Sequence, residues 1–128
     1  VVQNKSTRIL GIAEKSEGRL VGVISLSDIN PIDRKAKIAV MIGEVEFRNA
    51  SVSIEAHRMI IDHAFRELNL NRIYGAAMTK GWAEFLCRAI GFKMEGTLKQ
   101  DVYKRGSYHD VYQFAILREF FDSVVDEF

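Results

Sequence analysis

The stretch "EFRNASVSIEAHRMIIDHAF", residues 46–65, joins an extended, strand-like run to the beginning of an amphipathic helix. From Ser51 to Leu68 the apolar residues fall at helical spacing, and the polar "NLN" at 69–71 ends the pattern. The residues at the join are small or polar. The sequence therefore predicts a strand, a short loop and a helix that lies across the sheet.

The loop at 48–53 has two interpretations. In the first, backbone N–H groups at the helix start hold a phosphate, because these donors have no partner in the helix and the helix dipole favours an anion. In the second, Asn49, Ser51 or Ser53 caps the helix, and Glu55 lies in its first turn. The two interpretations are compatible, and both stay open at this point.

Upstream of this helix, the sequence predicts three strands. The segment "RILGIAEKSEGRLVGVISLSDI", residues 8–29, has two β-rich runs separated by Ser-Glu-Gly at 16–18, which predicts a hairpin. After the turn "NPIDRK", the run from Ile38 to Ile42 is almost continuously apolar. Such a run predicts a central strand that is covered on both faces.

Downstream, a strand is expected over 72–78 and a short helix over 82–90, which Gly91 ends. The segments "FKMEGTLKQDVY" and "YHDVYQFAIL" flank "KRGS", where Gly106 can adopt the positive φ of a tight turn, so a second hairpin is expected. The tail "REFFDSVVDEF" carries one apolar helical stripe, which packs on the parent domain or, less often, forms a dimer contact. The stripe consists of Phe120, Phe121, Val124, Val125 and Phe128.

The composition of the 128 residues fits one domain over 1–128, because 48% hydrophobic residues suffice for one shared core. The 18 basic and 17 acidic residues are interspersed, which argues against nucleic acid as a partner. No apolar run approaches the roughly 20 residues of a membrane span, and no secretory signal is evident, so we expect a cytoplasmic protein without a membrane partner. The single cysteine, Cys87, and the three histidines form no metal-ligand motif.

In their order and spacing, several of these segments resemble the GNAT superfamily of acetyl-CoA-dependent N-acetyltransferases, in particular its ribosomal-protein alanine acetyltransferase (RimJ/RimL-like) branch. The matching pieces are "GRLVGVISL", "IGEVEFRNASVSIEA" running into "IIDHAFRELNLNRIY", "AIGFKMEGTLKQDVYKRGSYHDV" and "LREFF". The resemblance extends from about Arg8 to Phe121 and implies an α/β (mixed α+β) acyl-CoA N-acyltransferase fold, a twisted mixed sheet flanked by helices. Relatives usually begin with a further strand and helices, which suggests either a fragment or a site completed by another subunit.

The resemblance also implies acetyl-CoA as a co-substrate. Its pantetheine arm would pair with exposed backbone in a V-shaped opening between the central strands, a role that we assign to Val40, Met41 and Ile42. A loop of pattern R-x-x-G-x-G/A would hold the pyrophosphate. In this chain that loop is Arg48, Asn49, Ala50, Ser51, Val52 and Ser53, without glycine.

Further departures from the family pattern concern the chemistry. Family members often carry Asn-x-x-Ala at the start of the short helix and, four residues later, a Tyr that protonates the leaving thiolate; these positions are Lys80, Ala83 and Cys87. A thiol can donate a proton as a phenol does, so Cys87 is either the catalytic acid or a packed cysteine. Lys80 either pairs with a cofactor phosphate or is a solvated lysine.

The general base of the family is absent, because Lys37 occupies the position where many relatives place a carboxylate. Other carboxylates, Asp28, Glu44 and Glu46, are each more often solvated charges. His57 is expected at the boundary of the core. His109 and Asp110 match a family pattern that we interpret as structural.

Two classes of function follow from these observations. The first is an N-acetyltransferase that moves an acetyl group from acetyl-CoA directly to a primary amine, such as a protein N-terminus, a small amine or an amino sugar. The second is a catalytically degenerate binding or assembly module of the same fold, or an acyl-CoA sensor that binds without turnover. A homodimer is compatible with either class.

Overall fold

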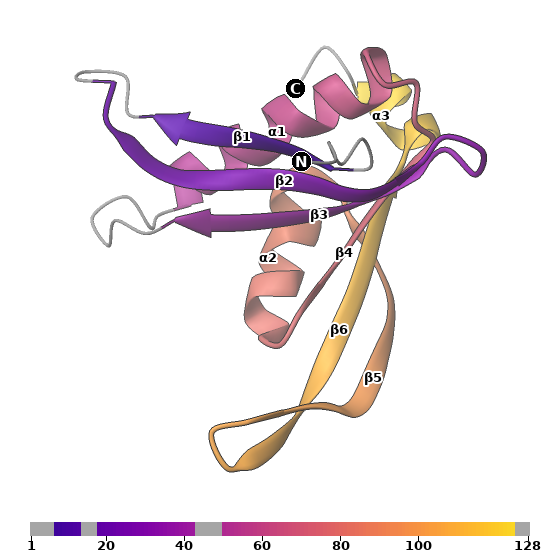
Figure 1. Cartoon of the computed structure of the whole chain (residues 1–128). Helices are drawn as coiled ribbons and strands as arrows, with labels where there is room; N and C mark the ends of the chain where they lie inside the picture. The colour runs from indigo at the N-terminus through magenta and orange to yellow at the C-terminus, as the bar shows by residue number, and fades with distance from the viewer. Residues whose placement is uncertain (1–6, 14–17, 43–49, 125–128) are drawn as a thin grey trace, which may run out of the picture.

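The computed structural model describes residues 7–13, 18–42 and 50–124 of the chain. Within these ranges, six strands form one sheet and three helices accompany it (Figure 1). In chain order the elements are β1 (Arg8–Ala13), β2 (Leu20–Asn30), β3 (Lys35–Ile42), α1 (Ala50–Arg66), β4 (Arg72–Ala77), α2 (Lys80–Ile90), β5 (Lys93–Lys104), β6 (Ser107–Leu117) and α3 (Arg118–Val124). In the same ranges, no helix combines the length and the apolar character that crossing a membrane requires.

The strand order in the sheet is β1-β2-β3-β4-β6-β5. The central strands β3 and β4 pair in parallel, whereas the other neighbouring strands pair antiparallel. Both expected hairpins are confirmed. In the β5–β6 turn, Arg105 and Gly106 have φ angles of 53° and 81°, the positive values that a two-residue hairpin loop needs at both positions.

Helix α1 buries one continuous stripe of side chains against the sheet and against α2. The stripe follows the helical repeat and consists of Ser53, Ala56, His57, Ile60, Ile61, Ala64 and Phe65. Each large apolar side chain that is fully buried stabilises the fold by about 1.5–3 kcal/mol, so this stripe fixes the helix on the sheet. The expectation that Glu55 lies in the first turn was wrong, because the helix begins at Ala50 and its first turn holds no acidic residue.

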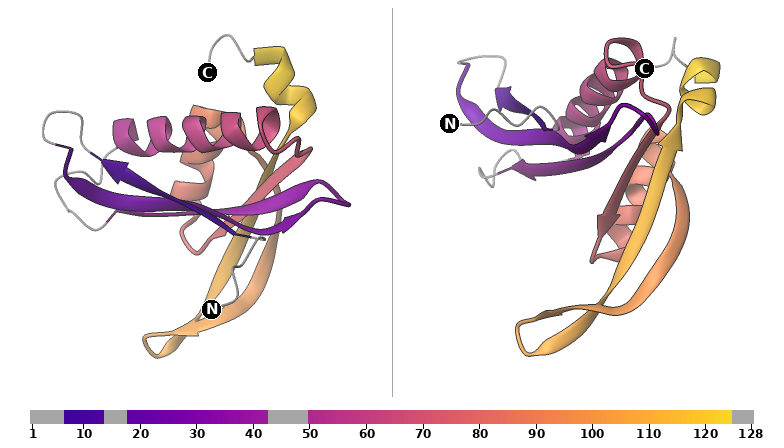
Figure 2. Two further views of the ribbon diagram at one scale, coloured as in Figure 1. Left: turned by 45° about the horizontal axis from the view of Figure 1, so that its top comes forward. Right: turned by 45° about the vertical axis from the view of Figure 1, so that its right-hand side comes forward.

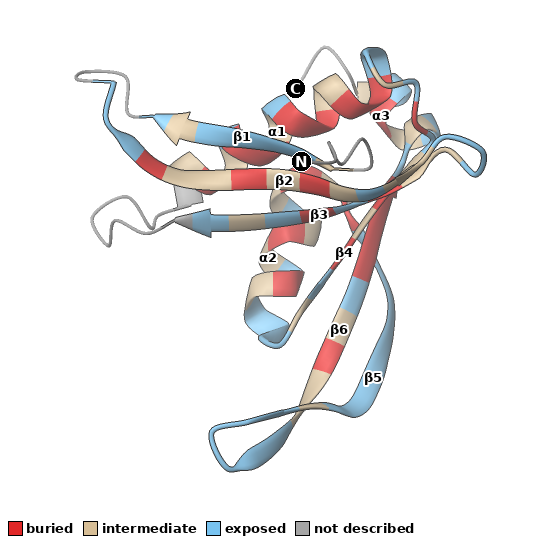
Figure 3. Cartoon of the chain, viewed as in Figure 1, coloured by how far each residue is buried: buried red, intermediate tan, exposed pale blue. Residues whose placement is uncertain are grey.

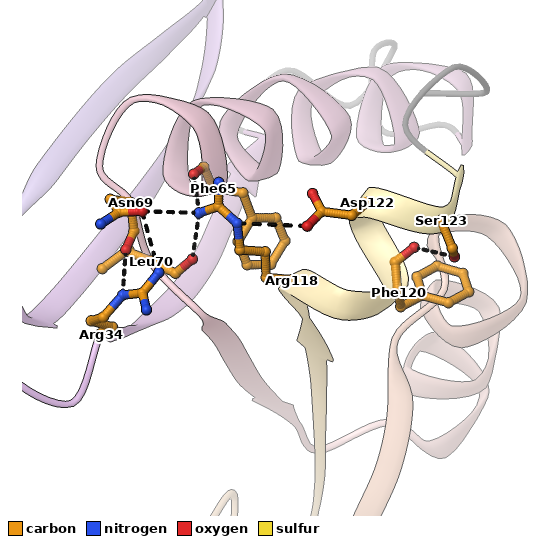
Figure 4. A network of polar contacts seen from close by, with 8 residues as sticks. All are labelled: Arg34, Phe65, Asn69, Leu70, Arg118, Phe120, Asp122 and Ser123. Carbon is orange, nitrogen blue, oxygen red and sulfur yellow. Dashed lines mark hydrogen bonds and ion pairs between the residues drawn. The ribbon is translucent and has the colours of Figure 1, made fainter.

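The end of α1 is held by a network of polar contacts that Figure 4 shows. Asn69 adopts a left-handed conformation with φ 55°, and Arg118 Nη1 donates hydrogen bonds to the carbonyls of Phe65 (2.6 Å) and Leu70 (3.3 Å). From the β2–β3 turn, Arg34 Nε donates to the carbonyl of Asn69 (2.8 Å). The network therefore ties two other parts of the chain, the β2–β3 turn and the start of α3, to carbonyls at the end of α1 and in the residues that follow it. Carbonyls at a helix end receive no hydrogen bond from within the helix.

Helix α2 packs against β4, β5 and β6 and ends at Gly91, as expected. Gly91 has φ 110° and its N–H donates to the carbonyl of Cys87 (3.2 Å). A left-handed glycine of this kind is a common helix stop, because glycine carries no Cβ penalty there.

Helix α3 contains the described part of the apolar tail. Phe121 is fully buried and its ring lies 5.0 Å from that of Phe65, centroid to centroid. The expected packing of the tail on the parent domain is thus confirmed for this residue. Val125 and Phe128 lie outside the described residues.

Strand β3 is central but is covered on one face, so the expectation of cover on both faces was wrong. Ala36 and Ile38 are buried in the core, whereas Lys37, Ala39 and Met41 are exposed, Met41 to 69%. Alternating exposure of this kind arises because α1 lies behind β2 and β3 and no described element packs on the opposite face (Figures 2 and 3).

Candidate functional site

The two central strands separate after a short parallel junction. Their paired residues are Lys35 with Arg72, Ala36 with Ile73, and Lys37 with Tyr74. Beyond this junction, β3 pairs only with β2 and β4 pairs only with β6, and the two strands diverge (Figure 1). We call this opening the fork. Residues 38–42 of β3 and 75–77 of β4 do not pair with each other, although each set pairs with the strand on its outer side. The fork is therefore the V-shaped opening that the resemblance implied.

Lys37 and Tyr74 stand at the base of the fork. They are the last paired residues of the junction and lie directly opposite each other, so their side chains share one face of the sheet, the exposed one. Tyr74 is half-buried, and the guanidinium of Arg72 lies 5.8 Å from the centre of its ring. No motif marks Tyr74 in the sequence; only the pairing register brings it beside Lys37.

A two-pronged ion pair borders this face. Arg72 Nη1 donates to Glu95 Oε2 (2.7 Å), and Nη2 donates to the other carboxylate oxygen. These hydrogen bonds raise the pKa of Arg72 and lower the pKa of Glu95. The pair joins the start of β4 to β5 across β6, and it keeps both charges at neutral pH.

The expected phosphate loop coincides with the beginning of α1. Arg48 and Asn49 lie outside the described residues, and α1 begins at Ala50, so the positions from Ser51 to Ser53 form its first turn. A capping residue precedes the helix; Ser51 and Ser53 lie inside it, and the expectation that either of them caps it was wrong. The first N–H groups of a helix have no intrahelical acceptor, and this turn carries no acidic side chain.

His57 is buried in the core, with 2% of its surface exposed, so its expected place at the core boundary was wrong. Its Nδ1 donates to the carbonyl of Ser53 (2.8 Å), since a carbonyl can only accept, and its ring stands edge-on to Phe92 at 6.4 Å between centroids. Burial lowers the pKa of His57, although the bond to Ser53 opposes this. The ring is therefore neutral at pH 7 and links the first turn of α1 to the start of β5.

Helix α2 carries the three remaining candidates. Lys80 is its first residue, with a side chain that is 67% exposed and an Nζ 4.0 Å from Glu84 Oε1. Ala83 is fully buried in the core, which leaves its methyl group inaccessible. Cys87 is a half-buried free thiol, and burial, together with Glu84, raises its pKa. The thiol therefore keeps its proton at neutral pH, which suits a proton donor better than a nucleophile.

The other charged candidates lie away from the fork or outside the described ranges. Asp28 is exposed in a bulge of β2 with φ 51°, and Glu44 and Glu46 lie outside the ranges that the structure describes. Asp110 accepts the Gln100 N–H (2.9 Å), which lowers the pKa of its carboxyl group. His109 Nε2 lies 3.0 Å from the Lys104 carbonyl, so both residues hold the hairpin together, in agreement with the structural interpretation. Among residues 7–13, 18–42 and 50–124, no cluster of three potential metal ligands occurs.

A groove of about 850 Å³ runs along the outer side of α1 and does not reach the fork. Its described lining comes from this helix alone: Ser51, Ile54, Glu55, Arg58, Met59, Asp62 and Arg66. Acidic and basic side chains are mixed along it. The candidate site is accordingly the fork, the first turn of α1 and the neighbouring face of α2.

A parallel junction that opens into a fork, with a helix start beside it, is the arrangement of the acyl-CoA N-acyltransferases. The sequence model of the acetyltransferase (GNAT) domain matches residues 2–93, which is more than half of the chain. The chain belongs to the GNAT family.

Among its relatives is the protein named "Putative ribosomal N-acetyltransferase YdaF" of Bacillus subtilis (strain 168), which is 34% identical over 103 residues, 80% of this chain and 56% of YdaF. The spermidine N(1)-acetyltransferase of Vibrio cholerae serotype O1 is 30% identical over 108 residues, 84% of this chain and 62% of that protein. A crystal structure of the V. cholerae spermidine N-acetyltransferase with CoA and spermine superposes with a TM-score of 0.82 at 28% identity, over 90% of this chain and 68% of that one. The chain thus spans a little more than half the length of the curated relatives that it matches.

Proposed function

We propose that the protein is an acetyl-CoA-dependent N-acetyltransferase in which residues 1–128 form one domain and an acetyl group passes directly to a primary amine. The observation that carries this proposal is the fork. Strands that part after Lys37 and Tyr74 expose backbone N–H and C=O groups that an extended, amide-containing chain can pair with.

The residues present fit acetyl-CoA in two respects. Residues 38–42 of β3, which include Val40, Met41 and Ile42, offer an unpaired edge of a length suited to the pantetheine arm. The first turn of α1 carries no carboxylate, and the positive end of the helix dipole there favours an anion such as a pyrophosphate. Arg48, Lys80 and the backbone of 49–53 would hold the phosphates.

When bound, acetyl-CoA supplies a thioester carbonyl that a free amine can attack. The protein itself positions the reacting groups and supplies a proton. Cys87, whose raised pKa keeps the thiol protonated, would hold the proton that the departing sulfur needs. Lys37 and Tyr74 flank the fork on the exposed face, so the amine would approach from that side.

For the acceptor, we propose a small polyamine or a protein N-terminus. The support comes from the relatives, one of which carries the name of a spermidine N(1)-acetyltransferase and another that of a ribosomal N-acetyltransferase. In both acceptor types the reacting group is an unhindered primary amine.

The proposal is tested by calorimetric titration with acetyl-CoA and coenzyme A, followed by release of free thiol in the presence of spermidine, spermine, glucosamine and peptides beginning with Ala or Ser. We expect binding and acceptor-dependent thiol release. Lys80→Ala should weaken coenzyme A binding by about 3–5-fold, the effect of one exposed charge, whereas Lys99→Ala, an exposed lysine on the β5–β6 hairpin, should not. Absence of binding would refute the proposal, and binding without turnover for any amine would favour the acyl-CoA sensor.

A further inference from the structure

The exposed face at the base of the fork carries a row of side chains that crosses four strands. The pairing register places in this row Lys37 of β3, Tyr74 of β4, Ala115 of β6 and Lys93 of β5. Residues paired in this way share one face of the sheet, and neighbouring strands lie about 5 Å apart. Because Ala115 is small, the ring of Tyr74 is the largest side chain between the two lysines of the row.

A second row, at the closed end of the junction, adds two more cations to the same face. Lys35 lies directly opposite Arg72. Like charges that face each other across two strands destabilise a sheet. The charge of Arg72 is compensated, because both oxygens of Glu95 accept hydrogen bonds from its guanidinium. The charge of Lys35 has no such compensation.

Lys35 and Lys37 have no acidic partner within the described part of the chain. Neither side chain takes part in an ion pair or a hydrogen bond with another described residue. Asp28 lies in the bulge of β2, between the strand partners of the two lysines, and pairs with neither of them. Asp33, in the following turn, accepts a hydrogen bond from the side chain of Asn30 (3.0 Å).

The remaining lysine of this face lies close to acidic groups. Lys93 lines a pocket of about 380 Å³ together with Glu95 and Glu119. Of the two lysines without an acidic partner, Lys37 is exposed and stands beside the opening, whereas Lys35 is half-buried. The uncompensated positive charge of the face is therefore centred on Lys37, next to the fork.

An uncompensated cation beside the opening selects among acceptors by their charge. A polyamine carries further ammonium groups beside the amine that reacts, and Lys37 and Lys35 repel them. A carboxylate near the reacting amine is attracted instead, and a hydrogen bond between an ammonium and a carboxylate is stronger than one between neutral groups. Charges of one sign along a cleft also raise the local concentration of substrates of the opposite sign.

We propose that the acceptor is a primary amine with an acidic group a few bonds away, and that Lys37 recognises this acidic group. The inference rests on the proposed function, since it concerns the acceptor of that same reaction. Two sources supply this chemistry: a free amino acid, and a peptide N-terminus with Asp or Glu among its first residues. Of the two acceptor types considered above, the charges of this face therefore favour the protein N-terminus over the polyamine. Lys37 acts as a specificity-determining residue through its charge and takes no part in the transfer of protons.

Acceptors that differ only in charge test the inference. We compare kcat/KM, from the release of free thiol, for the peptide amides Ser-Asp-Gly-Gly, Ser-Asn-Gly-Gly and Ser-Lys-Gly-Gly, for serine against serinamide, and for spermidine. At about pH 9 the α-amine of a peptide is largely free, whatever the neighbouring residue. We expect the acidic peptide to react fastest and the basic peptide slowest, with about tenfold between them. Serine that reacts faster than the acidic peptide identifies the free amino acid as the source, and the reverse order identifies the peptide.

Variants of Lys37 assign the preference to this residue. Lys37→Gln should level the three peptides, and Lys37→Glu should reverse their order. Lys104→Glu makes the same change in net charge at the end of the β5–β6 hairpin, which projects away from the fork (Figure 1), and should leave the order unchanged. Thermal melts check that each variant is folded, as expected for an exposed side chain without a described partner.

Calorimetric titration with the acetylated peptides, on protein saturated with coenzyme A, makes the same comparison without turnover. Tighter binding of the acetylated acidic peptide, lost in Lys37→Glu, would support the inference even for a protein that binds acetyl-CoA and transfers nothing. A preference for spermidine or for the basic peptide, or an acidic preference that Lys37→Glu retains, would overturn the inference and leave the proposed function intact. A protein that binds neither acetyl-CoA nor coenzyme A would refute the proposed function, and the inference with it.

Discussion

Replacing Arg118 with methionine is expected to destabilise the whole domain. In the native state its Nη1 donates to the carbonyls of Phe65 and Leu70 and to Asn69 Oδ1 (3.3 Å), which lie at the end of α1 and just beyond it. Hydrogen bonds from a charged donor contribute about 1.5–3 kcal/mol when buried. Because the Arg118 side chain is 30% exposed, water weakens these hydrogen bonds, and we expect the variant to lose about 2 kcal/mol of unfolding free energy. Methionine keeps the apolar stem, so the loss reports on the polar head.

Equilibrium unfolding in urea, followed by circular dichroism, measures this loss directly. The same loss should be visible in thermal melts. For 128 residues, an unfolding entropy of about 2.1 cal/mol/K per residue totals about 0.27 kcal/mol/K, so 2 kcal/mol lowers the Tm by about 7 °C. The midpoint should move while the slope of the urea transition stays constant.

The matched control is Asp122→Asn. Asp122 contacts the same guanidinium, with its Oδ2 3.7 Å from Arg118 Nε, but its side chain is 62% exposed. An exposed pair of this kind contributes little, and we expect a change below about 0.5 kcal/mol. If Arg118→Met lies within about 0.5 kcal/mol of wild type, or if Asp122→Asn costs as much, the carbonyl contacts do not hold the helix end and the reasoning is refuted.

Three further predictions concern single positions. Gly91→Ala should cost about 2–4 kcal/mol of unfolding free energy, and Gly106→Ala about 1 kcal/mol. Both glycines have positive φ, but of the two only Gly91 has a side chain, the ring of Phe120, in the place that an added Cβ would occupy. Equal losses in urea would contradict this. Burial lowers the pKa of His57, so its contribution to stability is complete above the unfolded pKa of about 6.5 and is lost as the pH falls below it. His57→Phe should therefore remove a slope of up to about 1.4 kcal/mol per pH unit from the free energy of unfolding, measured in urea between about pH 5 and 7. An unchanged slope would assign the effect to another group. Since burial raises the pKa of Cys87, iodoacetamide should alkylate the folded protein at about pH 8 at least several-fold more slowly than the urea-unfolded chain, and equal rates would show that the thiol is not protected.

The sequence predicts most of the fold because its signals are local and strong. The helical stripe of α1, the hairpin turn at Arg105–Gly106 and the stop at Gly91 each depend on residues close together in the chain. The exposure of one face of β3 could not be predicted in the same way, since Ala39 and Met41 are apolar whether or not another element packs on them. The burial of His57 was missed for a related reason: its position on the apolar side of a helix does not reveal how deep that side lies.

The candidate site is less accessible to sequence reasoning. The fork results from the register between β3 and β4, and no sequence pattern near Lys37 or Tyr74 indicates where the parallel pairing stops. The altered positions Lys80 and Cys87 were found only through the family resemblance, whereas the raised pKa of Cys87 needed its burial and the nearby Glu84. Chemistry that depends on depth and register therefore emerges only from the folded chain.

The short parallel junction between β3 and β4 also bears on how the chain assembles. Strands β1 to β3 form by consecutive antiparallel pairing on one side, and β5 and β6 form a hairpin on the other, so both halves close short loops. The junction joins them only after α1 has crossed between its strands, and non-local contacts of this kind form late because the loop-closure entropy must be met first. Substitutions at the junction should consequently accelerate unfolding more than they slow folding. The contacts that we expect to form last in folding and the opening that we propose for acetyl-CoA thus lie at the same place in the sheet.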